Sequence, residues 1–530
     1  MSLHGLSLIA GVPGRTGGRT FHAVNPANAE PLEPAFHEAP PAEADQALDA
    51  AAAAFTGYRA RPAAERAHLL DTIAAGIEAL GEPLLQRASL ETGLPLARLT
   101  GERGRTCGQL RLFAQLVREG SWVDARIDPA LPDRQPLPRP DLRRMLLPLG
   151  PVVVFGSSNF PLAFSVAGGD TASALAAGCP VVVKAHRAHP GTSELVAGAI
   201  TRAIAACGLS PGLFSLIHGG GASIGIAMVK HPATTAVGFT GSHVAGRALF
   251  DAAASRPHPI PVFAEMSSIN PVFLLPGAVR ERGAALAQGL LTSFTLGVGQ
   301  FCTKPGLVFA LRGSDTDAFI GKLAELVRAA PSGTMLTSGI REAYVDNRAK
   351  ITAVPGVTPL AHGGGSAEHA RTEQPPSVAT TTAQNFLRHP ALATEAFGPF
   401  VLVLLADSTD ELEACAAALE GQLTATLHGT AADLAGARAL LATLEQKAGR
   451  IVINGFPTGV EVCPAMNHGG PYPATTDARF TSVGTAAIQR FVRPVCYQSL
   501  PDELLPPALQ NANPLGLLRL VNGTPTRERV

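Results

Sequence analysis

Short runs of apolar, β-branched residues recur along most of this chain, and alanine-rich stretches with helical spacing lie between them. Strands that are apolar on both faces and separated by helices are typical of parallel sheets covered on both sides. One series of runs lies at 151–155, 180–184, 213–218 and 235–240, and a second at 271–275, 306–311, 400–406, 423–429 and 450–455. The pattern predicts an α/β fold with two successive α/β units and a cleft between them.

The remaining segments have other patterns. Residues 40–120 show the three- and four-residue spacing of amphipathic helices. Residues 121–142 are rich in proline and charge, which indicates a β-arm or a linker, and 363–380 are predicted to be a polar, flexible loop or excursion. The chain of 530 residues is too long for one compact core, so two or three domains are expected.

Composition excludes several classes of protein. Lys plus Arg and Asp plus Glu number 42 each, so no charge excess favours nucleic acid or an anionic membrane. The seven cysteines include no CxxC pair, which argues against a disulfide framework or a structural zinc site and for a reducing compartment. Neither a signal peptide nor a membrane-spanning run is recognisable. We expect a cytoplasmic protein without a metal, and its neutral balance is compatible with a homo-oligomer.

Cys302 is the candidate nucleophile. A lone cysteine is more often a small core side chain, but GVGQFCTKPG surrounds this one with loop-forming residues at the end of an apolar segment. A thiolate on such a loop at a cleft would attack a carbonyl carbon. Glu265 follows a β-like run and has apolar sequence neighbours, which should raise its carboxyl pKa and suit it to general-base catalysis. The amide of Asn159 could donate to an oxyanion, although a turn or helix-capping role is common for asparagine.

Residues that could hold a phosphate follow two of the predicted strands. Lys184 ends the strand at 180–184, where ligands bind in open α/β sheets, and His186 and Arg187 come next. In FTGSHVAG, Gly241 permits a tight turn, Ser242 can cap a helix and Gly246 allows that helix to approach the sheet. Taken alone, this glycine spacing is equally compatible with a structural turn.

Six segments in a fixed order make the chain similar to the aldehyde dehydrogenase superfamily over roughly residues 20–500. They are SSNFP (157–161), VVVK (181–184), GFTGS (238–242), AEMSSINP (264–271), GQFCTKP (299–305) and EAFGPF (395–400). The resemblance implies a Rossmann-like cofactor domain at 1–122 and 142–262 and a catalytic α/β domain at 263–477. It also implies a small β oligomerisation arm at 123–141 and 478–500, followed by a tail at 501–530 that orders on a neighbouring subunit or stays partly flexible. A homodimer or homotetramer is expected.

The resemblance also implies roles for the site residues. Cys302 would attack an aldehyde, Asn159 and the Cys302 N–H would hold the oxyanion, and Glu265 would activate water to hydrolyse a thioester. Lys184 and Glu395 would hold the two riboses of a nicotinamide cofactor. Phe397 would pack near the nicotinamide, and Gly241 and Ser242 would lie by the pyrophosphate.

One departure from the family pattern concerns the cofactor. Many members have a glutamate three residues after the strand-end lysine, where it binds the adenosine 2′-hydroxyl of NAD. This chain has Arg187 there, with His186 beside it. Replacing a carboxylate by a cation should favour a 2′-phosphate, so we predict NADP as the preferred cofactor, with NAD possible.

The segments 184–196 and 468–498 resemble one subfamily, the 2,5-dioxopentanoate (α-ketoglutaric semialdehyde) dehydrogenases, with a fatty-aldehyde dehydrogenase as a near relative. An acidic substrate would need a cation in the cleft, and the segment ERGRTCGQLRLFAQ supplies Arg103, Arg105 and Arg111, of which one at most is expected to point inward. A fatty aldehyde would instead need an apolar tunnel, for which Phe113, Phe160, Phe164 and Phe294 are candidates.

Two other interpretations stay open. Acylating members pass the acyl group to coenzyme A, and these members and the acyl-phosphate reductases generally lack the base that Glu265 supplies here. A non-catalytic structural or binding relative would be expected to lose the nucleophile, which Cys302 retains.

Overall fold

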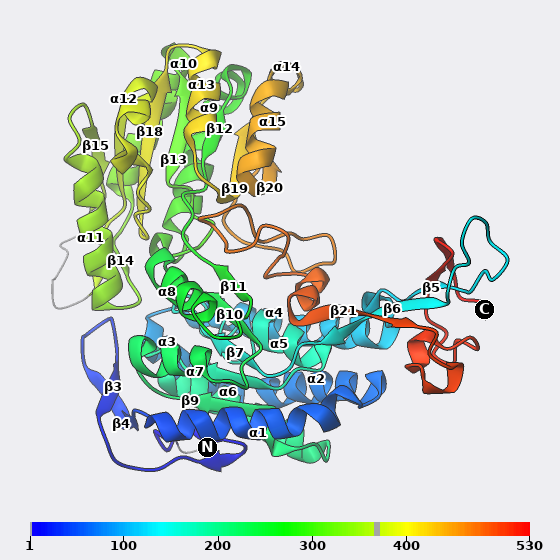
Figure 1. Cartoon of the computed structure of the whole chain (residues 1–530). Coiled ribbons are helices and arrows are strands. Elements are labelled where there is room, and N and C mark those ends of the chain that lie inside the picture. The colour runs from blue at the N-terminus through cyan, green and yellow to red at the C-terminus, as the bar shows by residue number, and fades with distance from the viewer. Residues whose placement is uncertain (1–2, 365–371) are drawn as a thin grey trace.

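The computed structural model describes residues 3–364 and 372–530. Two seven-stranded sheets form two lobes, one above the other in Figure 1, and a five-stranded sheet forms an arm that projects from the lower lobe. This arrangement confirms the predicted α/β fold with two units.

The N-terminal part supplies the outer helices of the lower lobe. The predicted helical region forms four helices: α1 (Pro41–Arg59), α2 (Ala63–Glu78), α3 (Gly81–Thr92) and α4 (Leu96–Glu119). A hairpin of β3 (Thr20–Val24) and β4 (Pro31–His37) precedes them. Helix α4 ends where Gly120 adopts a left-handed conformation with φ of 80°, which glycine accepts without steric cost.

The first sheet has the order β11-β10-β7-β8-β9-β1-β2. The first five strands of this order, β11, β10, β7, β8 and β9, are parallel to one another. Its strands are β1 (Leu8–Ile9), β2 (Val12–Pro13), β7 (Val152–Phe155), β8 (Val181–Lys184), β9 (Phe214–Ile217), β10 (Ala236–Thr240) and β11 (Val262–Glu265). The helices that connect them are α5 (Gly169–Ala177), α6 (Pro190–Ala206), α7 (Ile226–Lys230) and α8 (His243–Ala254). Every residue of β7, β8 and β9 is buried, as expected for a sheet covered on both faces.

The second sheet has the order β15-β17-β18-β13-β12-β19-β20. Its strands are β12 (Val272–Leu274), β13 (Leu307–Leu311), β15 (Thr358–His362), β17 (Ser377–Thr382), β18 (Phe400–Ala406), β19 (Gln422–His428) and β20 (Ala448–Ile453). Its helices are α9 (Pro276–Thr295), α10 (Ser314–Ala329), α11 (Ser338–Thr352), α12 (Ala383–Arg388), α13 (Thr409–Ala418), α14 (Ala431–Gly436) and α15 (Arg438–Lys447). A two-stranded ribbon of β14 (Gly333–Thr334) and β16 (Glu373–Gln374) lies apart from this sheet.

The prediction of a polar loop at 363–380 was wrong for its last part. Residues 365–371 lie outside the described residues, but Ser377–Thr382 form β17, a largely buried strand that pairs in parallel with β18. Its serine and threonines hid it from a search for apolar runs, although threonine and valine favour extended backbone.

Three segments build the arm sheet, in the order β21-β6-β5-β22-β23. Its strands are β5 (Arg126–Asp128), β6 (Leu142–Pro148), β21 (Val492–Gln498), β22 (Arg519–Val521) and β23 (Thr524–Thr526). The C-terminal tail therefore extends the arm of its own chain. Residues 478–491, which we had assigned to the arm, run beside the end of β11 instead.

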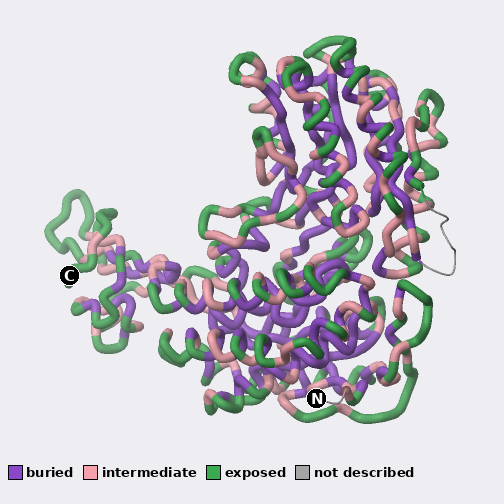
Figure 2. The backbone as a smooth tube through the Cα atoms, turned by 180° about the vertical axis from the view of Figure 1, so that it is seen from behind, coloured by how far each residue is buried: buried purple, intermediate pink, exposed green. Residues whose placement is uncertain are grey.

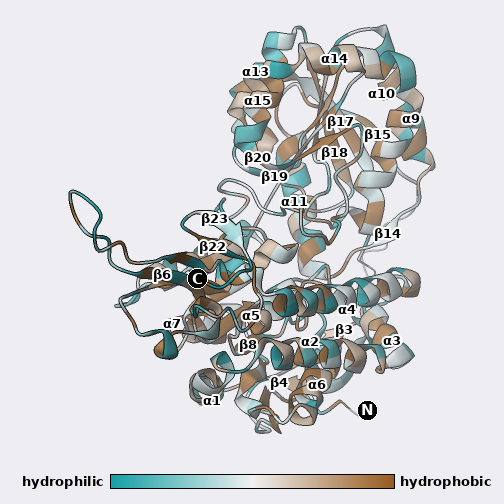
Figure 3. Cartoon of the chain, turned by 90° about the vertical axis from the view of Figure 1, so that its right-hand side faces the viewer, coloured by the Kyte–Doolittle hydropathy of each residue, from teal (hydrophilic) through white to brown (hydrophobic). Residues whose placement is uncertain are grey.

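Buried residues run through both sheets, whereas the tip of the arm is exposed (Figure 2). The apolar strands at the centre of each lobe and the polar outer helix faces are seen in Figure 3. Within residues 3–364 and 372–530, no helix combines the length and apolar character that crossing a membrane would require.

Candidate active site

Cys302 lies on a loop between α9 and β13, held by unusual backbone conformations. Gly297, Val298 and Gly299 all have positive φ, from 56° to 68°. A Cβ on Gly299 would come within 2.4 Å of the Gly398 backbone, so only glycine fits there. Asn270 secures the far side of the loop, since its Nδ2 donates to the carbonyl oxygen of Cys302 at 2.8 Å. The loop thus holds the thiol partly exposed beside a cavity of about 510 Å³.

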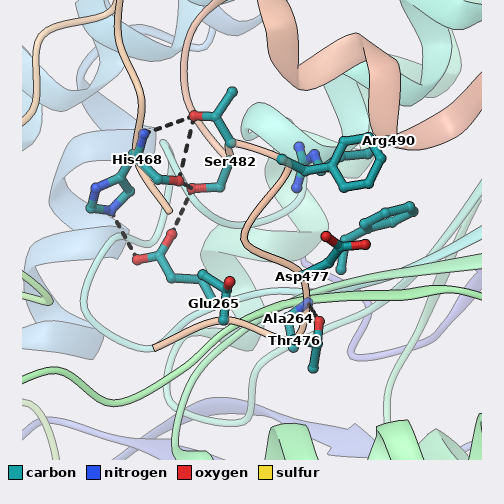
Figure 4. A pocket seen from close by; sticks show the side chains of 11 residues that line it. Ala264, Glu265, His468, Thr476, Asp477, Ser482 and Arg490 are labelled. Carbon is teal, nitrogen blue, oxygen red and sulfur yellow. Dashed lines mark hydrogen bonds and ion pairs between the residues drawn. The ribbon is translucent and has the colours of Figure 1, made fainter. Parts of the chain in front are cut away.

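Glu265, the last residue of β11, lines the same cavity and is almost fully buried. Its Oε1 lies 2.9 Å from Nε2 of His468, and its Oε2 accepts a hydrogen bond of 2.6 Å from Oγ of Ser482. Nε2 of His468 is also 3.4 Å from Sγ of Cys302. Figure 4 shows His468 and Ser482 directed at the two oxygens of Glu265.

The expected rise of the Glu265 pKa was wrong. Burial alone would raise the pKa of this carboxyl, but the imidazole of His468 and the hydroxyl of Ser482 lower it overall. The sequence neighbours are apolar, yet the contacting side chains are polar and come from a distant segment. The pKa of the Cys302 thiol is raised, first by burial and then by the nearby charge of Glu265.

The segment that carries His468 and Ser482 is fixed along β11 by backbone hydrogen bonds. The N–H of Met266 donates to the carbonyl of Ala474 at 2.7 Å, and the N–H of Thr476 donates to that of Ala264 at 3.1 Å. A small cavity of about 20 Å³ lies behind Glu265, His468 and Ser482. Sequence reasoning gave His468 and Ser482 no role, and the only signal was a polar histidine before two glycines in the segment 468–498.

Asn159 lies between β7 and α5 and lines the cavity with Cys302. Its Nδ2 donates to the carbonyl of Gln300 at 3.0 Å, which directs the amide toward the Cys302 loop. Its own carbonyl accepts a hydrogen bond of 2.8 Å from Arg98. The Arg98 guanidinium lies over the rings of Phe160 and Phe301, at 4.9 and 4.8 Å from their centroids.

Of the three arginines considered for a substrate carboxylate, only Arg105 is directed inward. Its guanidinium lies 5.1 Å from the ring centroid of Phe164, and its Nε and Nη2 are buried with no hydrogen-bond partner among the described residues. Arg111 lines the same second cavity as Arg105 but forms two hydrogen bonds, of 2.7 and 2.6 Å, with Glu78. Arg103 donates to the carbonyl of Gly81.

Arg105 also lines a second cavity, of about 460 Å³, together with Glu461. Its guanidinium lies close enough to Cys302 and Glu265 for their charges to interact, although it does not line the cavity that holds Cys302. The aromatic residues predicted for a fatty-aldehyde tunnel divide into two groups. Phe160 and Phe164 pack with Phe301 beside Arg105, whereas Phe113 and Phe294 are fully buried in separate hydrophobic cores.

Most of the residues predicted to hold a cofactor follow β8 and β10 of the first sheet. Gly241 and Ser242 line the 510 Å³ cavity, as do Glu395 and Phe397 from the second lobe. Ser242 caps α8, since its side chain accepts from the N–H of Ala245. Gly246 does not line the cavity: a Cβ there would come within 2.7 Å of Met266, so this glycine lets α8 pack closely on the sheet.

Lys184 is buried at the end of β8, and burial and then the nearby Arg187 lower its pKa to about 8. His186 does not supply a second charge: burial holds its pKa well below the usual value, and its Nδ1 accepts a hydrogen bond from the N–H of Ala188. Arg187 is exposed, lies 4.5 Å from the ring centroid of Phe21 and forms an ion pair with Glu38.

Glu395 lines the cavity, and Lys304 is buried near enough for the two charges to interact. Burial raises the Glu395 pKa to about 7 and lowers the Lys304 pKa to about 8. Nζ of Lys304 donates to the carbonyls of Ala396 and Phe400, both at 3.0 Å, and so fixes the loop that presents Glu395 and Phe397. Elsewhere in the site, a carboxylate oxygen of Glu265, Sγ of Cys302 and a ring nitrogen of His468 lie within 4.8 Å of one another.

A thiol, a carboxylate and an amide donor beside one cavity at the interface of two α/β lobes define an enzyme of the aldehyde dehydrogenase class. The sequence model of the aldehyde dehydrogenase family matches residues 13–487, and the chain belongs to this family. It is an oxidoreductase that acts on small aldehydes, and enzymes of the family use NAD or NADP.

Two curated relatives are similar over nearly their whole length. The chain is 55% identical to alpha-ketoglutaric semialdehyde dehydrogenase 2 of Azospirillum brasilense, covering 98% of both chains. It is 48% identical to alpha-ketoglutaric semialdehyde dehydrogenase of Acinetobacter baylyi, covering 96% of both. The structure of 3,6-anhydro-L-galactose dehydrogenase in complex with NAP superposes with a TM-score of 0.80 at 23% identity, covering 93% of this chain and 99% of the other, which confirms the fold.

Proposed function

We propose that this chain oxidises 2,5-dioxopentanoate to 2-oxoglutarate with NADP, through a thioester on Cys302. The observation that carries the chemistry is the placement of Cys302, Glu265 and Asn159 around one cavity, with the thiol and the carboxylate bridged by His468. The observation that supports the substrate is that Nε and Nη2 of Arg105 are buried and have no hydrogen-bond partner among the described residues. The two curated relatives named for alpha-ketoglutaric semialdehyde support the same substrate.

The residues around the 510 Å³ cavity fit a nicotinamide cofactor. Its volume lies in the usual range of cofactor sites, and it combines an aromatic side chain, a carboxylate and a capped helix start. Phe397 would pack near the nicotinamide, Glu395 and Lys184 would hold the riboses, and Gly241 and Ser242 would adjoin the pyrophosphate. When bound, the cofactor supplies the hydride acceptor.

The residues of the chain supply the other steps. The thiolate of Cys302 adds to the aldehyde carbon, and the Asn159 amide with the Cys302 N–H stabilises the oxyanion. After oxidation the acyl group is a thioester of Cys302. Glu265 then takes a proton from water, the resulting hydroxide adds to the thioester carbon, and the Cys302 thiolate leaves.

A preference for NADP rests on cations near the adenosine ribose. Arg187 and the partly charged Lys184 would attract a 2′-phosphate, whereas the carboxylate of Glu38 partly neutralises Arg187. The expected kcat/KM is therefore higher with NADP than with NAD. A clearly higher value with NAD would contradict this part of the proposal.

The substrate assignment is tested by NADP-linked rates with 2,5-dioxopentanoate, succinic semialdehyde, a medium-chain fatty aldehyde and propanal. The Arg105→Ala variant should raise KM for the dioxo acid roughly tenfold or more, without a matching change for propanal. Arg111→Ala is the matched control, because it removes an arginine of the same helix that is already paired with Glu78. Equal KM values in wild type and Arg105→Ala would rule out the carboxylate-binding role.

Two predictions accompany the proposal. A homodimer or homotetramer is expected from the projecting arm, and sedimentation of the purified enzyme decides between them.

The fatty-aldehyde alternative predicts the highest kcat/KM for the medium-chain aldehyde, but Phe113 and Phe294 are remote core residues that could not line its tunnel.

A further inference from the structure

His468 occupies the position between the nucleophile and the general base. Its Nε2 is 3.4 Å from Sγ of Cys302 and 2.9 Å from Oε1 of Glu265, and its side chain is fully buried. Its backbone N–H donates to Oγ1 of Thr481 at 2.8 Å, and the ring of Phe164 lies 6.3 Å from the imidazole centroid. The ring is therefore held in place from the backbone and from the aromatic side.

The hydrogen-bond pattern decides which ring nitrogen carries a proton. Oε2 of Glu265 already accepts a hydrogen bond from Oγ of Ser482, which fits a carboxylate whose Oε1 can only accept, so Nε2 of His468 must be the N–H that donates to it. Nδ1 is buried and has no hydrogen-bond partner among the described residues. An imidazolium would bury a second N–H without an acceptor, which is costly, so the neutral tautomer with its hydrogen on Nε2 fits this site.

We propose that His468 is a fixed hydrogen-bond donor shared by Cys302 and Glu265, and that it is not the base that removes the thiol proton. The proposal rests on the proposed thioester function of Cys302. With Nε2 already protonated, this nitrogen has no lone pair to offer the thiol, and Nδ1 is on the other side of the ring. The acceptor within reach is the carboxylate of Glu265, whose oxygen lies within 4.8 Å of Sγ.

The activation step then balances as follows. The S–H bond of Cys302 breaks and its electron pair stays on sulfur, while the proton forms an O–H bond with Glu265, which releases it to solvent before the thioester is hydrolysed. A protonated carboxyl is a weaker acceptor than a carboxylate, so Nε2–H shifts its donation toward the new thiolate. Ser482 keeps Glu265 in position during this change, and the positive charge of Arg105 further favours the thiolate.

Donor and base roles predict different results for conservative variants. Glutamine at 468 keeps an N–H donor but cannot accept a proton, whereas leucine removes both functions. Alkylation by iodoacetamide, followed by mass spectrometry of the Cys302 peptide in the full-length enzyme without aldehyde, measures the thiolate directly. We expect His468→Leu to slow alkylation of Cys302 roughly tenfold or more, and His468→Gln to stay within about threefold of wild type.

Matched controls separate this effect from damage to the fold. His428→Leu removes another buried imidazole, which packs on Phe456 away from the thiol, and should leave the alkylation rate unchanged. NADP binding and the thermal midpoint of each variant verify that it is folded. If the leucine variant does not fold, the glutamine variant alone decides.

Two outcomes overturn the proposal. Alkylation of His468→Gln as slow as that expected for leucine would make His468 the base, and a wild-type rate in a folded His468→Leu would deny it any role at the thiol. Since no aldehyde is used, an incorrect substrate assignment would not affect the measurement. The proposed function fails separately if complete alkylation of Cys302 leaves NADP reduction intact.

Discussion

Arg187 and Glu38 form an ion pair of 3.1 Å beside the end of β8, although one follows that strand and the other follows the N-terminal hairpin. The arginine is half-exposed and the glutamate is more enclosed, so a cofactor phosphate could reach the guanidinium from the open side. Cofactor preference thus depends on how strongly Glu38 competes with a 2′-phosphate for Arg187.

Glu38→Gln should increase the preference for NADP over NAD several-fold, because the freed Arg187 can pair with the 2′-phosphate. Arg187→Glu should reduce kcat/KM for NADP roughly tenfold or more and spare NAD. The ratio of kcat/KM for the two cofactors measures both effects. Arg247→Ala, which breaks a surface pair with Asp251, serves as a control and should not alter the ratio.

Binding of NADP should weaken above about pH 8. Lys184 has a pKa of about 8 in the fold, so it is charged below that pH and neutral above it. KM for NADP is expected to rise as the pH passes from 7 to 9, and Lys184→Gln should have a high KM that no longer rises over this range. A flat wild-type profile would show that Lys184 does not hold the cofactor as a cation.

Glu265→Gln should lower kcat about a hundredfold or more, because both thiol ionisation and thioester hydrolysis lose their proton acceptor. Rapid mixing at alkaline pH should still show a first turnover of NADPH, followed by almost no steady-state rate. Ser482→Ala removes only one hydrogen bond to the carboxylate and is expected to cost about tenfold or less. Normal steady-state turnover in Glu265→Gln would exclude its role as base.

Asn159→Ala should reduce kcat roughly a hundred- to a thousandfold with a small change in KM, as expected for loss of an oxyanion donor. Arg98→Met offers a comparison, since it removes a hydrogen bond to the Asn159 backbone and leaves the amide in place. Arg98→Met should therefore reduce kcat less than Asn159→Ala does. A large rise in KM with unchanged kcat would instead assign Asn159 to ground-state binding.

Asn270→Ala should destabilise the fold and also slow the reaction. Asn270 has a φ of 51° and donates to the carbonyls of Cys302 and Lys304, while its Oδ1 accepts from Ser268 and Thr424. Its loss leaves buried polar groups without partners at a cost of about 1–3 kcal/mol each. The thermal midpoint should fall by a few degrees, whereas Asn347→Ala, on the more open helix α11, should change it little.

The strands and the three central site residues could be predicted because each has a local signature. Every apolar run of the two series became a strand within one or two residues of its expected bounds. Cys302, Glu265 and Asn159 could be picked out because Glu265 and Asn159 follow apolar strand-like runs, Cys302 follows an apolar helical segment, and their order matches one family. Local sequence was sufficient to predict a residue's place where a single strand or loop determines its position.

Features that depend on contacts between distant segments could not be predicted. His468 reaches Glu265 only because the segment after β20 is hydrogen-bonded along β11, and this contact reversed the expected pKa shift. Glu38 meets Arg187 through the packing of the N-terminal hairpin. Sequence alone could not show whether Arg105 or Arg111 is the candidate to bind the substrate carboxylate, because this depends on which face of α4 is turned toward the site.

The last residues of the chain decide which strand forms one edge of the arm sheet, because β22 and β23 cover the side of β5 that would otherwise be its edge. β22 pairs with β5 through the N–H of Leu520 and of Asn522, which donate to the carbonyls of Ala125 and Ile127. Without that strand, the backbone groups of β5 would be unpaired and could template association with another chain. The tail therefore covers the pairing groups of β5 with a short terminal hairpin, and we expect a protease cut just before β22 to increase self-association through the longer edge of β5 without touching the active site.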